Sequence, residues 1–182
     1  MKAQKRYLLA LTILVICLNI LSVSGQSVTG PTVPRPRKAR PSTEIAAQQA
    51  EDQQATAAVE QLLSKAGQKY QRLGTGVWAI RKNGPNLRYF QIVLSHRAGT
   101  LVTEVTVAKG NSLRVNDAAP ELLRLANRLE YAKVGLDRDG DVFVRNEARL
   151  QSLDVDELTN NLDKIAAAAD QIFVEVQKFS VK

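Results

Sequence analysis

Three aspartates and a glycine in "LDRDGDVFVRNE", residues 136–147, resemble a calcium-binding loop. An EF-hand loop needs oxygen ligands at positions one, three and five, glycine at six and a bidentate glutamate at twelve. Counted from Asp137, position six is Val142 and position twelve is Ala148. Asp139-Gly140 between apolar strands instead suits a tight hairpin turn. We therefore predict a turn and no metal site, with weak calcium binding by the clustered aspartates as the alternative.

His96 is the only histidine, and it falls in a segment that we expect to be the hairpin turn 96–99. With one histidine and a single cysteine, a zinc or copper site of ordinary composition cannot be assembled. Ser95 lacks the glycine-flanked setting of a catalytic serine. Asp154 and Asp156 are placed to start a helix, where negative charge is stabilising. We predict no catalytic residue and no cofactor; an enzyme that uses carboxylates alone is the alternative.

Trp78 is the only tryptophan and lies on a predicted strand with Ile80 on the same face. One interpretation places it in the core. The other leaves that face open and makes Trp78, Phe90 and Ile92 a partner-binding surface. An exposed sheet edge could also accept an extended peptide by strand addition.

The first 25 residues have the layout of a secretory signal peptide. A basic start precedes an apolar run from Tyr7 to Leu18 and a short stretch of small residues. The run is shorter than the roughly 20 residues of a comfortable spanning helix. We predict cleavage between Gly25 and Gln26 and an exported protein, periplasmic or extracellular. An uncleaved N-terminal membrane anchor is the alternative.

Cys17, the only cysteine, lies within this leader. Lipoprotein signals place a small residue before the modified cysteine, whereas Ile16 precedes Cys17, which disfavours lipidation. Once the leader is removed no cysteine remains, so the exported domain would have no disulfide.

The net charge of +7 comes from the leader and the segment after it. From Ser42 onward the chain has 18 basic and 18 acidic side chains. This balance disfavours a nucleic-acid partner, which needs Lys and Arg gathered on a folded face. Residues 26–41, "QSVTGPTVPRPRKARP", are predicted to be an extended linker. Peripheral contact of this basic linker with membrane or wall polymers is the alternative to a plain tether.

We expect residues 42–182 to form one α+β domain. A helix should begin at Pro41-Ser42-Thr43, carry its apolar stripe to Tyr70 and end at Gly74. Apolar alternation predicts three strands, at 77–83, 87–95 and 100–109. A short helix with Pro120 in its first turn follows, then two strands near 132–137 and 141–146. The predicted order is α-β-β-β-α-β-β-α, an antiparallel sheet with flanking helices.

The last helix should begin near Asp154. Its apolar residues alternate at spacings of three and four, as Leu158, Leu162, Ile165, Ala169, Ile172 and Val176 illustrate. Such a stripe can pair two copies in a coiled coil, which would make the protein a structural homodimer. Ala166 and Phe173 widen the stripe and favour packing against a sheet.

This order matches the fold of type III secretion chaperones. The segment "LLRLANRLEYAKVGLDRDGDVFVRNE" and the closing "AAAADQI" resemble the bacterial YbjN family, which shares that fold. The resemblance covers about residues 59–179. It implies a non-enzymatic protein that binds or regulates other proteins, loosely a sensory-transduction regulator. We therefore expect an exported protein-binding or regulatory module of the bacterial envelope, with a protein or peptide partner.

Overall fold

The computed structural model describes residues 42–181, with side chains from residue 46 onward, and the predicted leader and linker lie outside this part. The described part begins with helix α2 (Ser42–Lys65) and ends with helix α4 (Val155–Val176) and a short 3-10 turn, η2 (Gln177–Phe179). Between them lie six strands, a short helix α3 (Val115–Ala126) and a 3-10 turn η1 (Gly110–Ser112). The strands are β1 (Tyr70–Gly74), β2 (Val77–Lys82), β3 (Phe90–Arg97), β4 (Thr100–Ala108), β5 (Lys133–Leu136) and β6 (Val142–Arg149).

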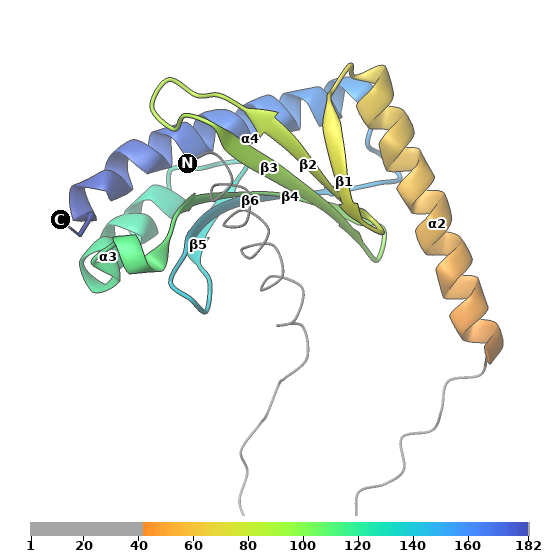
Figure 1. Cartoon of the computed structure of the whole chain (residues 1–182), viewed down its shortest axis with the longest axis horizontal. Coiled ribbons are helices and arrows are strands. Elements are labelled where there is room, and N and C mark those ends of the chain that lie inside the picture. The colour runs from red at the N-terminus through yellow and green to blue at the C-terminus, as the bar shows by residue number, and fades with distance from the viewer. Residues whose placement is uncertain (1–41, 182) are drawn as a thin grey trace, which may run out of the picture. The chain divides into compact units, whose positions relative to one another are not determined.

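The strands form one antiparallel sheet in the order β1-β2-β3-β4-β6-β5 (Figure 1). The first four strands follow one another as a meander, and β6 then pairs with β4 while β5 takes the edge. The helices lie on one side of the sheet or at its ends, so the α+β architecture predicted from the sequence is confirmed.

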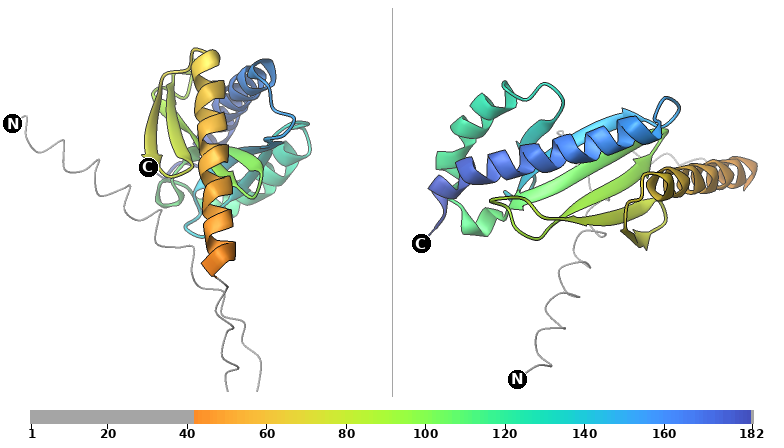
Figure 2. Two further views of the ribbon diagram at one scale, coloured as in Figure 1. Left: turned by 90° about the vertical axis from the view of Figure 1, so that its right-hand side faces the viewer. Right: turned by 90° about the horizontal axis from the view of Figure 1, so that it is seen from above.

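The core lies between one face of this sheet and α4, which crosses it (Figure 2). The apolar stripe of α4 faces the strands, and Leu162, Ile165 and Ile172 are fully buried. Burying a side chain of this size contributes about 1.5–3 kcal/mol. The prediction that this helix packs on the sheet is confirmed, and the alternative of a coiled-coil stripe open to a second copy is wrong, because the stripe is occupied within the domain.

The other face of the sheet carries no helix among the described residues (Figure 1). Side chains alternate between the two faces of a strand, so the residues between the buried ones point to this side, which we call the open face. One row of it crosses all six strands and consists of Gln71, Ala79, Val93, Glu104, Arg145 and Lys133.

Strand β1 was missed by the sequence analysis, which extended the first helix to Gly74. The helix ends at Lys65, and Gly67 follows it with φ +65°, a conformation that glycine adopts without strain. Tyr70 therefore starts a strand and does not lie on the helix stripe. All five residues of β1 are exposed, so this strand lacks the alternation that marks a half-buried strand.

Other boundaries differ by a few residues. The turn between β3 and β4 is confined to Ala98 and Gly99, both at positive φ as two-residue hairpin turns require, so His96 belongs to β3. Helix α3 begins at Val115, and no side chain caps it, so Pro120 lies inside the helix and the prediction that placed it in the first turn is wrong. Within residues 42–181 there is no helix with the length and apolar character needed to span a membrane.

Candidate functional site

The aspartate loop is a hairpin turn, as the sequence predicts. Gly140 has φ +77°, and the amides of Asp139 and Asp141 both donate to Oδ1 of Asp137 at 2.9 Å. The carboxylate of Asp141 accepts from Nζ of Lys109 at 2.5 Å and from the amide of Gly110 at 2.9 Å. Two of the three carboxylates are thus engaged within the fold, and no cluster of three metal-binding side chains occurs in the described residues.

Gly110 explains how tightly this hairpin is held. A Cβ atom at this position would lie 2.3 Å from the carbonyl oxygen of Asp139. The turn therefore packs directly on the backbone that follows β4, and the aspartate cluster has a structural role there.

His96 lies near the end of β3 and is half-buried. Its Nε2 accepts a hydrogen bond from the amide of Gly99 at 3.3 Å, and its own amide donates to the carbonyl of Gly76 at 2.8 Å. These contacts close the adjoining turns. Asp154 also has the predicted structural role, since its side chain accepts from the amide of Glu157 at the start of α4.

Trp78, Phe90 and Ile92 lie in the core, at 0%, 6% and 0% exposure. The indole Nε1 of Trp78 donates to Oε1 of Glu60 in α2 at 3.0 Å, which fixes that helix against the sheet. Their burial corrects the interpretation that offered these side chains to a partner, because the face that they share is covered by helices.

Asp170 was not singled out in the sequence analysis. It lies on α4, is 9% exposed, and accepts from the amides of Asn86 and Leu87 and from the side chain of Asn86 at 2.7–2.8 Å. Burial raises the pKa of this carboxyl, but the three hydrogen bonds outweigh burial and hold the pKa below its usual value. Asp170 thereby fastens the loop between β2 and β3 to the last helix.

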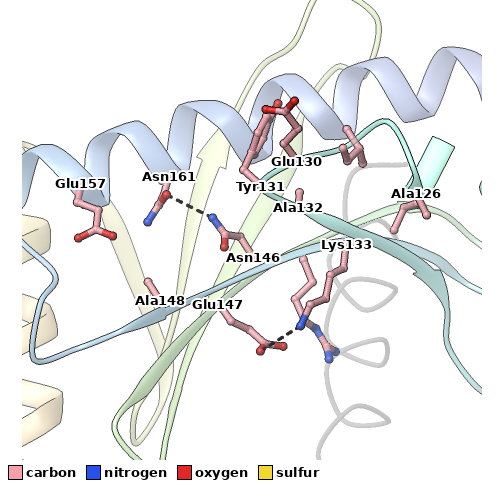
Figure 3. Close-up of a pocket in the computed structure, with 13 residues that line it drawn as sticks. Ala126, Glu130, Tyr131, Ala132, Lys133, Asn146, Glu147, Ala148, Glu157 and Asn161 are labelled. Carbon is pink, nitrogen blue, oxygen red and sulfur yellow. Dashed lines mark hydrogen bonds and ion pairs between the residues drawn. The ribbon is translucent and has the colours of Figure 1, made fainter.

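The candidate site is a cleft of about 700 Å³ where β6 continues past the end of β5 (Figure 3). Its walls are the segment that leads from α3 into β5 and the first half of α4. Asn146 of β6 donates to the side chain of Asn161 of α4 at 3.3 Å across the cleft. The lining residues are Ala126, Leu129, Glu130, Tyr131, Ala132, Lys133, Val134, Arg145, Asn146, Glu147, Ala148, Glu157 and Asn161.

One side of β6 has no strand partner along this cleft in the described part of the chain. β5 pairs with β6 only from Val142 to Arg145, whereas β4 pairs with it as far as Arg149. Backbone groups point alternately to the two sides of a strand, and the amide of Leu150 donates toward β4, to Gly99. The amides and carbonyls of Glu147 and Arg149 therefore point away from β4, toward the place where β5 has ended.

The three glutamates of the cleft belong to different elements. Glu147 is on β6 and pairs with Lys133 at 3.3 Å, Glu130 precedes β5, and Glu157 is on α4. Figure 3 shows their carboxylates pointing in different directions. This arrangement does not bring two acids onto one reacting atom, whereas a free strand edge with apolar and polar walls suits an extended peptide.

Three solved structures are similar to this chain at low sequence identity. YbjN of E. coli, described as "a putative transcription regulator", superposes with a TM-score of 0.50 and 11% identity over 68% of this chain and 92% of that chain. The ExoU–SpcU complex of the type III secretion system of Pseudomonas aeruginosa gives 0.48 and 16% over 65% and 97%. The Yersinia pestis type III secretion chaperone SycH, in complex with a fragment of YscM2, gives 0.48 and 13% over 64% and 98%.

No curated protein matches the chain. The model of one family, YbjN, described as "Putative bacterial sensory transduction regulator", matches residues 56–178. The match begins at Thr56, the first buried residue among the described side chains of α2, and runs past the end of α4. Because this match covers more than half of the chain and the whole sheet, the chain belongs to the YbjN family.

Proposed function

We propose that this chain is a non-enzymatic protein-binding module that captures an extended segment of a partner along the free side of β6. The observation that carries the proposal is the direction of the Glu147 and Arg149 backbone groups, which point away from β4, to the side of β6 that has no strand partner there in the described residues. An incoming segment would add to the sheet where β5 ends. Main-chain hydrogen bonds would supply affinity, and the walls of the cleft would select side chains.

The walls offer both kinds of contact that such a segment needs. Leu129 and Val134 are half-buried apolar side chains in the cleft, and Tyr131 keeps 38% of its surface exposed, with Nζ of Lys164 5.3 Å from its ring. Aromatic residues with a polar end are favoured at protein interfaces.

The test uses proline to block the free side of β6 alone. Glu147→Pro removes an N–H that does not take part in the β4–β6 ladder, and proline is tolerated in strands where the N–H faces away from the ladder. Glu147→Ala is the matched control, because it also loses the Lys133 ion pair but keeps the N–H. Ala148→Pro should disrupt folding, because the amide of Ala148 points toward β4.

Peptides would be selected from a random displayed library on the unmodified protein and measured on each variant. We expect the selected peptides to bind the Glu147→Ala variant with the same affinity as the unmodified protein. The same peptides should not bind the Glu147→Pro variant. The amides of Glu147 and Arg149 should gain protection from hydrogen exchange when a peptide binds. Unchanged binding by a folded Glu147→Pro variant would refute strand addition at this edge.

We further propose that the module acts outside the cytoplasm, in the bacterial envelope. The leader composition of residues 1–25 supports export, and the Pro- and Arg-rich segment 26–41 would tether the domain. Cell fractionation with N-terminal sequencing tests this. An exported protein that begins at Gln26 is expected, and a cytoplasmic protein that retains Met1 would contradict it.

A further inference from the structure

The open face of the sheet, on the side away from α4, carries more cations than carboxylates. Strand alternation and register place on it five basic side chains and two acidic ones. They are Arg81, Arg97, Lys133, Arg145 and Arg149 against Glu104 and Glu147. The described domain as a whole is nearly balanced in charge, so this excess is local. The residues of α4 show the opposite balance, with five acids and one lysine.

Both carboxylates of the open face are already engaged. Glu104 accepts from Nε and from the terminal nitrogen of Arg145 at 2.8 and 2.5 Å, and Glu147 pairs with Lys133. The remaining cations are Arg81, Arg97 and Arg149. All three are exposed, and none forms an ion pair within residues 46–181.

Two of these arginines, Arg97 and Arg149, form a pair that we call the clasp. Arg97 of β3 and Arg149 of β6 are both in register with Thr100 of β4. Neighbouring strands are about 4.8 Å apart, so the two arginine backbones are about 10 Å apart with the threonine hydroxyl between them. Side chains as long as arginine can close across this span on a single carboxylate, which the planar guanidinium binds with two parallel hydrogen bonds.

The row next to the clasp contains two valines. Val77, Ser95, Val102 and Glu147 lie in register across β2, β3, β4 and β6. Val77 and Val102 are half-buried and have no covering element among the described residues. A partner that meets both rows therefore needs acidic side chains beside apolar ones.

We infer that the open face is a second docking surface, which adjoins the cleft at Lys133, Arg145 and Glu147 and takes an acidic segment of a partner protein. Carboxylates of that segment pair with Arg97, Arg149 and Arg81, and its apolar side chains cover Val77 and Val102. A protein segment fits better than nucleic acid, because a phosphate backbone that crosses this face would also meet Glu104 and Glu147, and phosphate footprints are built from cations.

The test compares two double variants that change the net charge equally. Arg97→Gln with Arg149→Gln removes the clasp, and Arg128→Gln with Arg138→Gln removes two exposed arginines that lie off the open face. The probe is a fluorescent peptide of alternating glutamate and valine, and its partner probe has glutamine at each glutamate. Fluorescence anisotropy at low salt measures the binding of each peptide to the original protein and to both double variants.

The glutamate peptide is expected to bind the original protein, to lose affinity as salt is added, and to bind the clasp variant about tenfold more weakly, as two exposed ion pairs imply. The control variant should stay within about twofold. Equal binding of the glutamine peptide, or failure of both peptides to bind, would overturn the inference. Tighter binding of duplex DNA than of the glutamate peptide would overturn the inference and identify a nucleic acid as the partner of this face. Self-association that the clasp variant abolishes would overturn it as well and identify a second copy of this chain.

Discussion

Replacing Asp170 tests whether one buried carboxylate holds the β2–β3 loop to α4. Asp170→Ala leaves three donors without their acceptor: the amides of Asn86 and Leu87 and the side-chain amide of Asn86. Of the three hydrogen bonds only the one from the Leu87 amide is buried, and a buried donor without a partner costs about 1–3 kcal/mol. The other two donors can turn to water. We expect Asp170→Ala to lower the free energy of unfolding by about 1–3 kcal/mol.

Asp170→Asn separates the hydrogen bonds from the charge. The asparagine oxygen can still accept from the two amides, but its NH₂ group meets the NH₂ group of Asn86, so a loss of about 1–2 kcal/mol is expected. Asp163→Asn on the same helix is the control. Its carboxylate is 66% exposed and pairs with Lys82 at 3.4 Å, so its replacement should cost less than about 1 kcal/mol.

The pH dependence of the free energy of unfolding provides an independent test of this site. The pKa of Asp170 is lowered in the folded state from the ordinary value of 3.8, so the unfolded chain binds this proton at higher pH than the folded chain does. The stability that the carboxylate contributes is complete above pH 3.8 and is lost as the pH falls through the lower folded pKa. Urea unfolding followed by circular dichroism, repeated from neutral pH to pH 3, measures it.

The protein and the Asp170→Asn variant should differ most near neutral pH and converge in acid. If the two proteins differ in their free energy of unfolding by the same amount at every pH in this range, the electrostatic part of the argument is refuted. A cost below about 1 kcal/mol for Asp170→Ala would refute the hydrogen-bond part.

Three further predictions concern stability. Trp78→Ala should lower the free energy of unfolding by about 3–5 kcal/mol in urea, because it empties a fully buried site and removes the bond to Glu60; a loss below about 1 kcal/mol would contradict the burial. Gly110→Ala should cost about 1–3 kcal/mol and speed hydrogen exchange in the β5–β6 turn, since its Cβ would meet the backbone of Asp139; unchanged exchange would mean that the turn does not rest on Gly110. Millimolar calcium should leave Tm unchanged, because Asp137 and Asp141 already accept backbone amides; a rise of several degrees would restore the calcium loop.

The elements that the sequence predicted well are those with one buried face. In α4 the apolar spacing alone locates the side that packs on the sheet, and Asp154 at its first turn marks where the helix begins. In β4 the alternation of Leu101, Thr103 and Val105 gives the buried face directly. The turn at Asp139-Gly140 was correct for the same local reason, because its conformation depends on the residues of the turn itself.

The features that the sequence did not predict depend on contacts between distant segments. Asp170 looks like one polar residue in an alanine-rich helix, and its role appears only when the loop at Asn86 lies against it. The free side of β6 arises because the two neighbouring strands pair with different lengths of it. The pairing with β5 stops at Lys133, opposite Arg145, whereas the pairing with β4 extends to Thr100, opposite Arg149. The basic open face likewise arises because most acids of the part from Ser42 onward, which has 18 basic and 18 acidic side chains, lie elsewhere in the fold.

The pairing of β4 with β6 divides the domain into two blocks of local structure. Strands β1–β4 form a meander with short connections, β5 and β6 form a hairpin, and only the β4–β6 ladder joins the two blocks within the sheet. Two ion pairs bridge that junction: Glu104 with Arg145, and Lys109 with Asp141. Closing it requires a long loop through α3, which is the entropically costly step of folding. The chain is therefore suited to fragment complementation, with the cut placed after α3 and the two halves reassembled across the β4–β6 junction.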